Sequence, residues 1–193
     1  MKANKMKIKF IDVEKFGFAV EPRYYFYGWS RSSRILARES AIKALLSAQK
    51  LLPRGYNFKI WDAQRPLEVQ KQMIKSFRLR LKHANPKLDR QALDKLVFTF
   101  CSKPTKQVIK LGTHRNGGSF DLTIINGQGE ELYMGTDHDD ISERAETDYY
   151  EKKAVLNHFE QTAKHNRRLL KMVLEKSGFV NYNPEWWHWD WEE

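Results

Sequence analysis

The chain has 193 residues, 41% of them hydrophobic and 13% aromatic, and a formal net charge of +10. This length suits one domain with a sizeable core, and the apolar content argues against a disordered chain. A single cysteine, Cys101, excludes an intrachain disulfide bond. The sequence shows neither a signal-peptide pattern nor an apolar run long enough to span a bilayer, so we expect a cytoplasmic protein.

Nearly all of the net positive charge lies between Arg65 and Lys110, where twelve Lys and Arg residues accompany only three acidic ones. A surface of this kind could attract phosphate groups. No helix-turn-helix, zinc-finger or RNA-binding motif accompanies the charge, however, and the solvated face of one or two helices explains it as well. We therefore expect no nucleic-acid partner.

Apolar periodicity and turn residues predict helices and strands that do not alternate regularly along the chain. Apolar side chains recur every four residues from Val69 to Leu81, as on one face of a helix, whereas residues 120–125 alternate in the manner of a strand. Helices are predicted at 32–52, from 66 past 81, at 89–100 and at 148–177, and strands at 56–63, 120–125, 131–134, 179–182 and, as a strand or turn, 186–191.

This irregular order argues against parallel βαβ winding. The sequence favours an α+β fold, in which helices pack on an antiparallel sheet. We expect one domain over residues 1–193, with a basic helical elaboration at about 67–110. The turn N-G-Q-G at 126–129 predicts a hairpin, and an acidic, irregular loop is expected at 135–147.

Two histidines and two acidic residues occur in two short segments that could meet at a metal ion. The first segment, G-T-H-R-N-G-G-S-F-D, ends at Asp121 and contains His114; its glycines would let the backbone turn and bring the imidazole beside the carboxylate. The second, P-E-W-W-H, contains Glu185 and His188. Taken alone, Asp121 would be a solvent-facing acid on a strand, and His188 would be a structural histidine in an aromatic cluster.

Two imidazoles and one carboxylate would leave an open position on a tetrahedral Zn²⁺, which a catalytic zinc needs. Glu185 could then take a proton from the attacking water and hand it to the leaving amine. Residues three apart face opposite sides of a regular strand, so this arrangement requires a bend between Glu185 and His188, and Pro184 favours one. Four tryptophans between 186 and 191 would form a dry wall around the site.

Two further segments offer charged groups to a substrate. Arg65 is either a surface arginine or a guanidinium that holds an oxyanion or a substrate carboxylate. Its position in the sequence does not decide between these interpretations. The segment D-H-D-D at 137–140 lacks the glycine and the glutamate of an EF-hand, so it predicts no calcium loop; a carboxylate there could instead pair with a substrate ammonium. The histidines expected to be exposed are His83, His158 and His165.

These segments resemble the D-alanyl-D-alanine dipeptidases of the vancomycin-resistance (VanX-like) type, within the wider group of zinc D,D-peptidases and hedgehog-like proteins. The family pattern S-x-H-x-x-G-x-A-x-D, with E-x-W-H after it and D-x-x-R-P before it, appears here as G-T-H-R-N-G-G-S-F-D, E-W-W-H and D-A-Q-R-P. A further similar stretch, M-G-T-D-H-D-D-I-S-E-R, spans 134–144. The resemblance implies that one zinc ion is bound by His114, Asp121 and His188. It also implies that Glu185 is the general acid and base and that Arg65 stabilises the tetrahedral intermediate. Asp139 would bind the substrate ammonium, with the adjacent Asp140 as the alternative.

Four positions depart from the family pattern. Gly112 replaces a serine, Ser119 an alanine, Gln64 an often aromatic residue and His138 a phenylalanine. We expect these changes to bear on substrate choice and none of them to touch the zinc ligands.

The leading hypothesis is zinc-dependent hydrolysis of D-Ala-D-Ala to two D-alanines in peptidoglycan precursor metabolism, either in antibiotic resistance or in wall recycling. The nearest alternative is a D,D-carboxypeptidase or an L-Ala-D-Glu-type endopeptidase, and the acidic loop discriminates between them because it favours a free amino end. A non-catalytic zinc-containing binding module is a third possibility, against which the presence of Glu185 and Arg65 argues. A nucleic-acid-binding protein is the last alternative, and only the net positive charge supports it.

Overall fold

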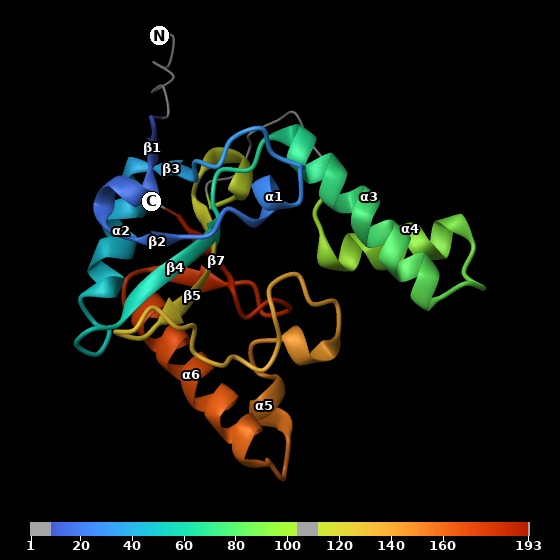
Figure 1. The fold of residues 1–193 in the computed structure, drawn as a ribbon. Helices are drawn as coiled ribbons and strands as arrows, with labels where there is room; N and C mark the ends of the chain where they lie inside the picture. The colour runs from blue at the N-terminus through green and yellow to red at the C-terminus, as the bar shows by residue number, and fades with distance from the viewer. Residues whose placement is uncertain (1–8, 104–111, 193) are drawn as a thin grey trace, which may run out of the picture.

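The centre of the molecule is a sheet whose strand order brings the predicted site segments together (Figure 1). The computed structural model describes residues 9–103 and 112–192. Within these residues, five strands pair in the order β2-β4-β5-β7-β6, and β1 pairs separately with β3. The strands are β1 (Phe10–Asp12), β2 (Ala19–Val20), β3 (Leu36–Arg38), β4 (Asn57–Asp62), β5 (Ser119–Ile125), β6 (Phe179–Asn181) and β7 (His188–Trp191).

Helices pack on this sheet, which confirms the predicted α+β fold. The strand pairs from β4 to β6 are antiparallel, as expected, whereas β2 runs parallel to β4. The helices are α1 (Arg23–Phe26), α2 (Glu39–Gln49), α3 (Leu67–Ala84), α4 (Arg90–Phe100), α5 (Tyr149–Lys152) and α6 (His158–Glu175), with short 3-10 helices η1 (Val13–Phe16), η2 (His114–Asn116) and η3 (Glu143–Ala145).

The main hydrophobic core joins the sheet to α2 and α6. On β5, Phe120, Leu122 and Ile124 are completely buried and belong to this core. Because alternate strand residues face opposite sides, Asp121 and Thr123 point away from it. Both are nevertheless buried, each only 1% exposed, so other parts of the chain cover the second face of β5 as well. Asp121 is therefore not a solvent-facing acid.

α3 and α4 form a helical hairpin that projects beyond the sheet (Figure 1). The predicted apolar face of α3 packs on α4 in a second, smaller core. Asp89 caps α4 as expected, because its carboxylate accepts a hydrogen bond of 2.8 Å from the backbone N–H of Ala92. Residues 104–110 of the predicted basic elaboration lie outside the described residues.

The helix predicted at 32–52 is shorter than expected. Residues 36–38 extend as β3 and pair with β1, in the register Phe10 to Arg38, so α2 begins only at Glu39. Pairing with a distant strand outweighs the local helical pattern here.

The second half of the chain also departs from two predicted elements. The helix predicted at 148–177 is interrupted after α5, and α6 starts with a capping box formed by Asn157 and Glu160. The predicted hairpin after β5 is reduced to a turn and one bridge between Ile125 and Glu131. The strands predicted at 56–63, 120–125 and 179–182 are confirmed within one or two residues at each end.

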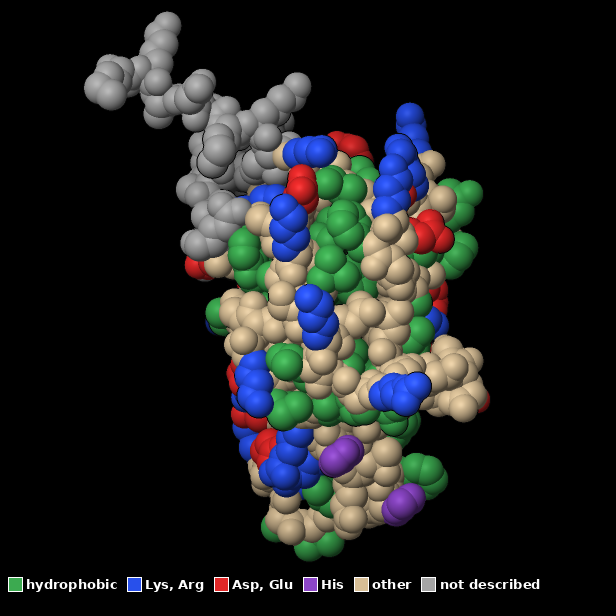
Figure 2. Space-filling view, turned by 90° about the vertical axis from the view of Figure 1, so that its left-hand side faces the viewer, with side chains coloured by type: hydrophobic (Ala, Val, Ile, Leu, Met, Phe, Trp, Pro, Cys, Tyr) green, Lys and Arg blue, Asp and Glu red, His purple; other side chains and the backbone are tan. Residues whose placement is uncertain are grey.

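Figure 2 shows the face on the left of Figure 1, remote from the α3–α4 hairpin. Lys and Arg side chains are scattered over this face, with acidic and apolar side chains between them, so they form no continuous basic patch there. Among the described residues, no helix combines the length and the apolar character needed to cross a bilayer.

A buried arginine fastens the loop between β5 and α5 to the rest of the fold. Arg167 of α6 is 3% exposed and donates hydrogen bonds to three backbone carbonyls of this loop, those of Met134 (2.8 Å), Arg144 (2.8 Å) and Glu146 (2.6 Å). Its guanidinium also lies 4.7 Å from the ring centroid of Tyr150. Arg167 thus anchors the loop that carries residues 137–140, together with contacts such as the ion pair between Arg23 and Asp137.

Replacing this arginine should loosen the loop. Arg167→Met removes the donors and leaves three carbonyls without their partner, so we expect the free energy of unfolding to fall by about 2–4 kcal/mol. Chemical denaturation measures the change. Arg168→Met is the matched control, because Arg168 pairs with Glu151 on the exposed side of the same helix and its loss should change stability little. Equal effects of the two substitutions would contradict this account.

Candidate active site

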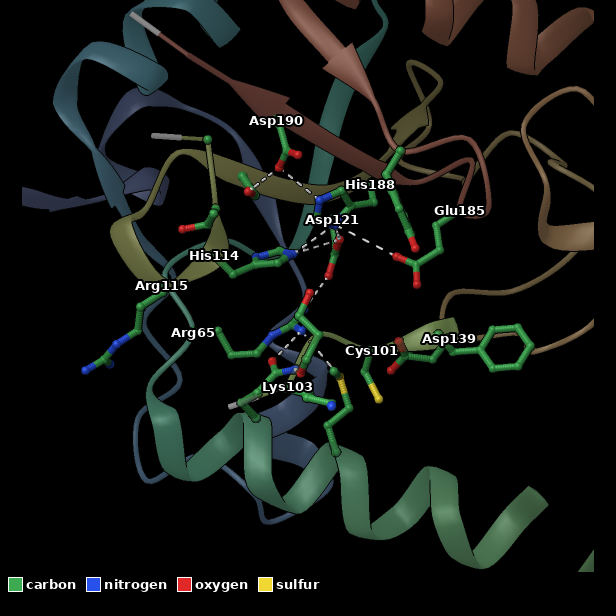
Figure 3. Close-up of a pocket in the computed structure, with 18 of the residues that line it drawn as sticks. Arg65, Cys101, Lys103, His114, Arg115, Asp121, Asp139, Glu185, His188 and Asp190 are labelled. Atoms are coloured by element: carbon green, nitrogen blue, oxygen red, sulfur yellow. Dashed lines mark hydrogen bonds and ion pairs between the residues drawn. The ribbon is translucent and has the colours of Figure 1, made fainter. Parts of the chain in front are cut away.

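The pairing of β5 with β7 places Asp121 directly opposite His188. The Nδ1 atom of His188 lies 3.1 Å from Oδ1 of Asp121. His114 enters from η2, where Gly117 adopts the left-handed conformation (φ 70°) that turns the chain into β5. Its Nε2 atom lies 3.2 Å from the same carboxylate oxygen and 3.1 Å from His188 Nδ1. The structure thus brings together the three residues that the sequence predicts as metal ligands (Figure 3).

The outer nitrogen of each histidine has an acceptor of its own. His114 Nδ1 lies 2.6 Å from the backbone carbonyl oxygen of Ala63, and His188 Nε2 lies 3.0 Å from Oδ1 of Asp190. An N–H on these outer nitrogens leaves the lone pairs of His114 Nε2 and His188 Nδ1 directed at Asp121 Oδ1. Two nitrogens and one oxygen that converge with free lone pairs fit a divalent metal ion.

The two oxygens of Asp121 have different partners. Oδ1 faces the two histidines, whereas Oδ2 accepts a hydrogen bond of 2.7 Å from Nη2 of Arg65 and lies 3.4 Å from Nε2 of His138. Burial acts to raise the pKa of Asp121, but the charge of His114 and hydrogen bonds from the three histidines outweigh it and hold the pKa well below its usual range. The group is therefore an ionised carboxylate with one oxygen for a metal.

Arg65 is 7% exposed and held on several sides. Its Nε donates to Asp62 (2.7 Å), its Nη1 to Gln70 (3.1 Å) and Met73 (3.3 Å), and its Nη2 to Asp121. A guanidinium has five N–H groups, so these four contacts leave one N–H of Nη2 without a partner among the described residues and available to a ligand in the pocket. Arg65 is a fixed cation behind Asp121 and not a surface arginine.

Glu185 reaches the site through the bend that the sequence requires. The backbone N–H of His188 donates to the carbonyl of Glu185 at 3.2 Å, which closes a turn just before β7. The Oε2 atom of Glu185 lies 3.9 Å from Nδ1 of His188, and the side chain borders the same pocket. Burial raises the pKa of Glu185 to about 7, a value suited to a group that both accepts and donates a proton near neutrality.

The acidic loop contributes Asp139 and not Asp140. Asp139 borders the pocket, and its Oδ2 atom is buried without a hydrogen-bond partner among the described residues, whereas its Oδ1 atom lies 3.4 Å from the hydroxyl of Tyr24. Its backbone has φ 61°, a strained conformation for a residue with a side chain. Asp140 instead accepts hydrogen bonds from Ser142. A buried, unpaired carboxylate oxygen favours a cationic ligand.

These groups surround a cavity of about 430 Å³. The α3–α4 hairpin and the residues just after it supply much of the apolar wall, so the described part of the basic elaboration forms one side of the pocket (Figure 3). The tryptophans do not form the predicted wall: Trp186, Trp187 and Trp189 are buried in the main core. The apolar residues that border the pocket are Leu67, Met73, Phe98, Phe100, Cys101 and Tyr182.

The expectation that no departure from the family pattern touches the zinc ligands is wrong. His138, whose side chain is fully buried, contacts Asp121, and Ser119 hydrogen-bonds Asp190, which holds His188. Sequence reasoning missed Asp190. Its signal was the alternation H-W-D-W in a strand, which places residues 188 and 190 on one face. The histidines expected to be exposed, His83, His158 and His165, are exposed.

The chain is similar in sequence to known dipeptidases. The model of a peptidase family described as D-Ala-D-Ala dipeptidase matches residues 27–193. A D-alanyl-D-alanine dipeptidase of Synechocystis sp. is 26% identical over 69% of this chain and 61% of its own length, so the chain spans less than two thirds of that protein. The proteins of the same name from Enterococcus faecalis and Escherichia coli are 27% and 26% identical, over 81% and 83% of this chain and 73% and 68% of their own lengths.

The family model covers every residue that borders the pocket, from Arg65 to Asp190. The chain belongs to the D-Ala-D-Ala dipeptidase family of peptidases.

Proposed function

We propose that this chain is a zinc-dependent dipeptidase that hydrolyses D-Ala-D-Ala to two D-alanines in peptidoglycan precursor metabolism. The observation that carries the proposal is the convergence of His114, Asp121 and His188 in one pocket with Glu185 and Asp139. The family membership and the names of the relatives support the choice of substrate.

Zinc is the metal that this donor set suits best. Two imidazole nitrogens and one carboxylate oxygen, with an open fourth position, are typical of catalytic zinc. A zinc ion bound there supplies a Lewis acid that polarises the peptide carbonyl and lowers the pKa of water.

The protein groups would perform the remaining steps. Asp139 would bind the ammonium group of the dipeptide, because its buried Oδ2 atom has no partner among the described residues. Glu185 would take a proton from the attacking water and later give it to the leaving amine. Arg65 would present its remaining Nη2 N–H to the developing oxyanion, a geometry fixed in advance by its contacts with Asp62 and Asp121.

The first prediction concerns the metal. Purified protein should contain about one zinc ion per chain, and His114→Ala or Asp121→Ala should retain little, because a site with three protein ligands depends on each of them. Elemental analysis of the purified proteins measures this. His165→Ala, which removes an exposed histidine of α6, is the control and should keep its zinc. Full zinc in both site variants would place the metal elsewhere.

The second prediction separates chemistry from metal binding. Glu185→Gln keeps the shape of the side chain but cannot act as a base, so zinc should stay bound while kcat falls by at least ~10²-fold. Steady-state kinetics on D-Ala-D-Ala, with zinc content measured on the same preparation, provides the comparison. A kcat equal to that of the unaltered protein would assign the base to another residue.

The third prediction tests the substrate class. Asp139→Asn removes the charge without new backbone strain, because asparagine tolerates a positive φ. We expect kcat/KM for D-Ala-D-Ala to fall about 10- to 100-fold, the loss expected for one charged hydrogen bond, and the preference over N-acetyl-D-Ala-D-Ala to shrink. Asp140→Asn is the matched control and should change neither quantity, since Asp140 does not border the pocket.

The acetylated substrate also distinguishes the nearest alternative. If the unaltered protein cleaves N-acetyl-D-Ala-D-Ala as well as the free dipeptide, a D,D-carboxypeptidase replaces the dipeptidase as the proposed function.

A further inference from the structure

Two residues outside the three predicted ligands form a hydrogen-bonded chain that ends on one of them. In the β5–β7 pair, Ser119 lies opposite Asp190, two positions along from the pair of Asp121 and His188 and therefore on the same face. The hydroxyl of Ser119 donates to Oδ1 of Asp190 at 2.5 Å. The same oxygen lies 3.0 Å from Nε2 of His188, on the side of the ring away from Asp121 (Figure 3).

The two histidines have different partners at their outer nitrogens. His114 Nδ1 lies 2.6 Å from the backbone carbonyl oxygen of Ala63 and 3.2 Å from Oδ2 of Asp62, an oxygen that also accepts a hydrogen bond from Arg65. The acceptor of His188 Nε2 is the carboxylate of Asp190. A carboxylate fixes the tautomer and the orientation of an imidazole, and it increases the electron density that the opposite nitrogen offers to a metal. The hydroxyl of Ser119, which is fully buried, in turn holds the carboxylate of Asp190 in place.

A glycine makes room for this arrangement. Gly112 has φ 70°, and a Cβ atom at this position would lie 3.3 Å from Cβ of Asp190 and 2.8 Å from Cγ of Glu192. The absence of a side chain at 112 thus permits β7 to pack closely against this segment at Asp190. Gly112 and Ser119, two of the departures from the family pattern, therefore both lie beside Asp190.

We propose that Asp190, held by Ser119, is a positioning residue that sets the metal affinity of the site by orienting His188. The inference rests on the proposed function only in that it needs the metal site. Asp190 and Ser119 also border the pocket, so the competing explanation is a direct contact with the substrate.

The test measures zinc affinity by competition with a chelator, which requires no activity. Asp190→Asn keeps the shape and an acceptor oxygen but removes the charge, and we expect the zinc dissociation constant to rise about 10- to 100-fold. Ser119→Ala should raise it by a smaller factor. The double variant should bind zinc no more weakly than Asp190→Asn alone, because Ser119 acts through Asp190.

Asp94→Asn is the matched control, since Asp94 is an aspartate that pairs with Arg78 at 2.7 Å away from the pocket. It should leave zinc affinity unchanged. The melting temperature of each metal-free variant should stay near that of the unaltered protein, which separates a local effect on His188 from unfolding. At saturating zinc, Asp190→Asn should leave KM for D-Ala-D-Ala nearly unchanged.

Three outcomes would overturn the proposal. Unaltered zinc affinity in Asp190→Asn would remove the positioning role while leaving the proposed function intact. A raised KM with unaltered zinc affinity would assign Asp190 to the substrate. Failure of the unaltered protein to bind zinc at all would end both this inference and the proposed function.

Discussion

The arrangement of the site depends on one buried negative charge, the carboxylate of Asp121. Removing an ionised carboxylate from water is costly unless cations and hydrogen-bond donors surround it. Here cationic and polar groups from four separate segments surround it: the residues just after β4 supply Arg65, η2 supplies His114, β7 supplies His188 and the acidic loop supplies His138. The need to satisfy this carboxylate therefore holds together the parts of the chain that build the pocket.

The two carboxylate oxygens of Asp121 have different roles. The oxygen toward Arg65 and His138 ties the carboxylate to the fold, and the oxygen toward the two histidines remains for a metal. Arg65 also donates its backbone N–H to the carbonyl of His114 at 2.9 Å, so the segment after β4 is hydrogen-bonded directly to the turn that carries His114. A site held in this way is formed in advance of substrate binding, which is what stabilisation of a transition state by fixed charges requires.

Much of the fold and the site could be predicted from local patterns. The alternation at 120–125, the four-residue apolar repeat from Val69 to Leu81 and the capping residue Asp89 are local signals. The structure contains the strand, the helix and the helix cap that they predict. The histidines and acids were found because they lie in compact motifs. The shortening of α2 depends on pairing with β1, some 28 residues earlier in the chain, which no local window contains.

The missed features of the site have a similar cause. The role of Asp190 follows from its pairing with Ser119 across two strands 71 residues apart, and that of His138 from the approach of its loop to β5. The tryptophans were assigned to the pocket because they neighbour His188 in sequence, but the turn at Glu185 directs them into the core. The capping box N-x-x-E that begins α6 is a local signal at 157–160, and it places a helix start inside the single helix predicted at 148–177.

We propose that one zinc ion, held by His114, Asp121 and His188, makes the chain a dipeptidase. Titrating metal-free protein with Zn²⁺, while measuring bound zinc and D-alanine released from D-Ala-D-Ala in the same samples, tests it most directly. We expect bound zinc and released D-alanine to rise together and to level off at about one zinc ion per chain. Full release of D-alanine without metal, or saturation with zinc and no release from the dipeptide, would contradict it.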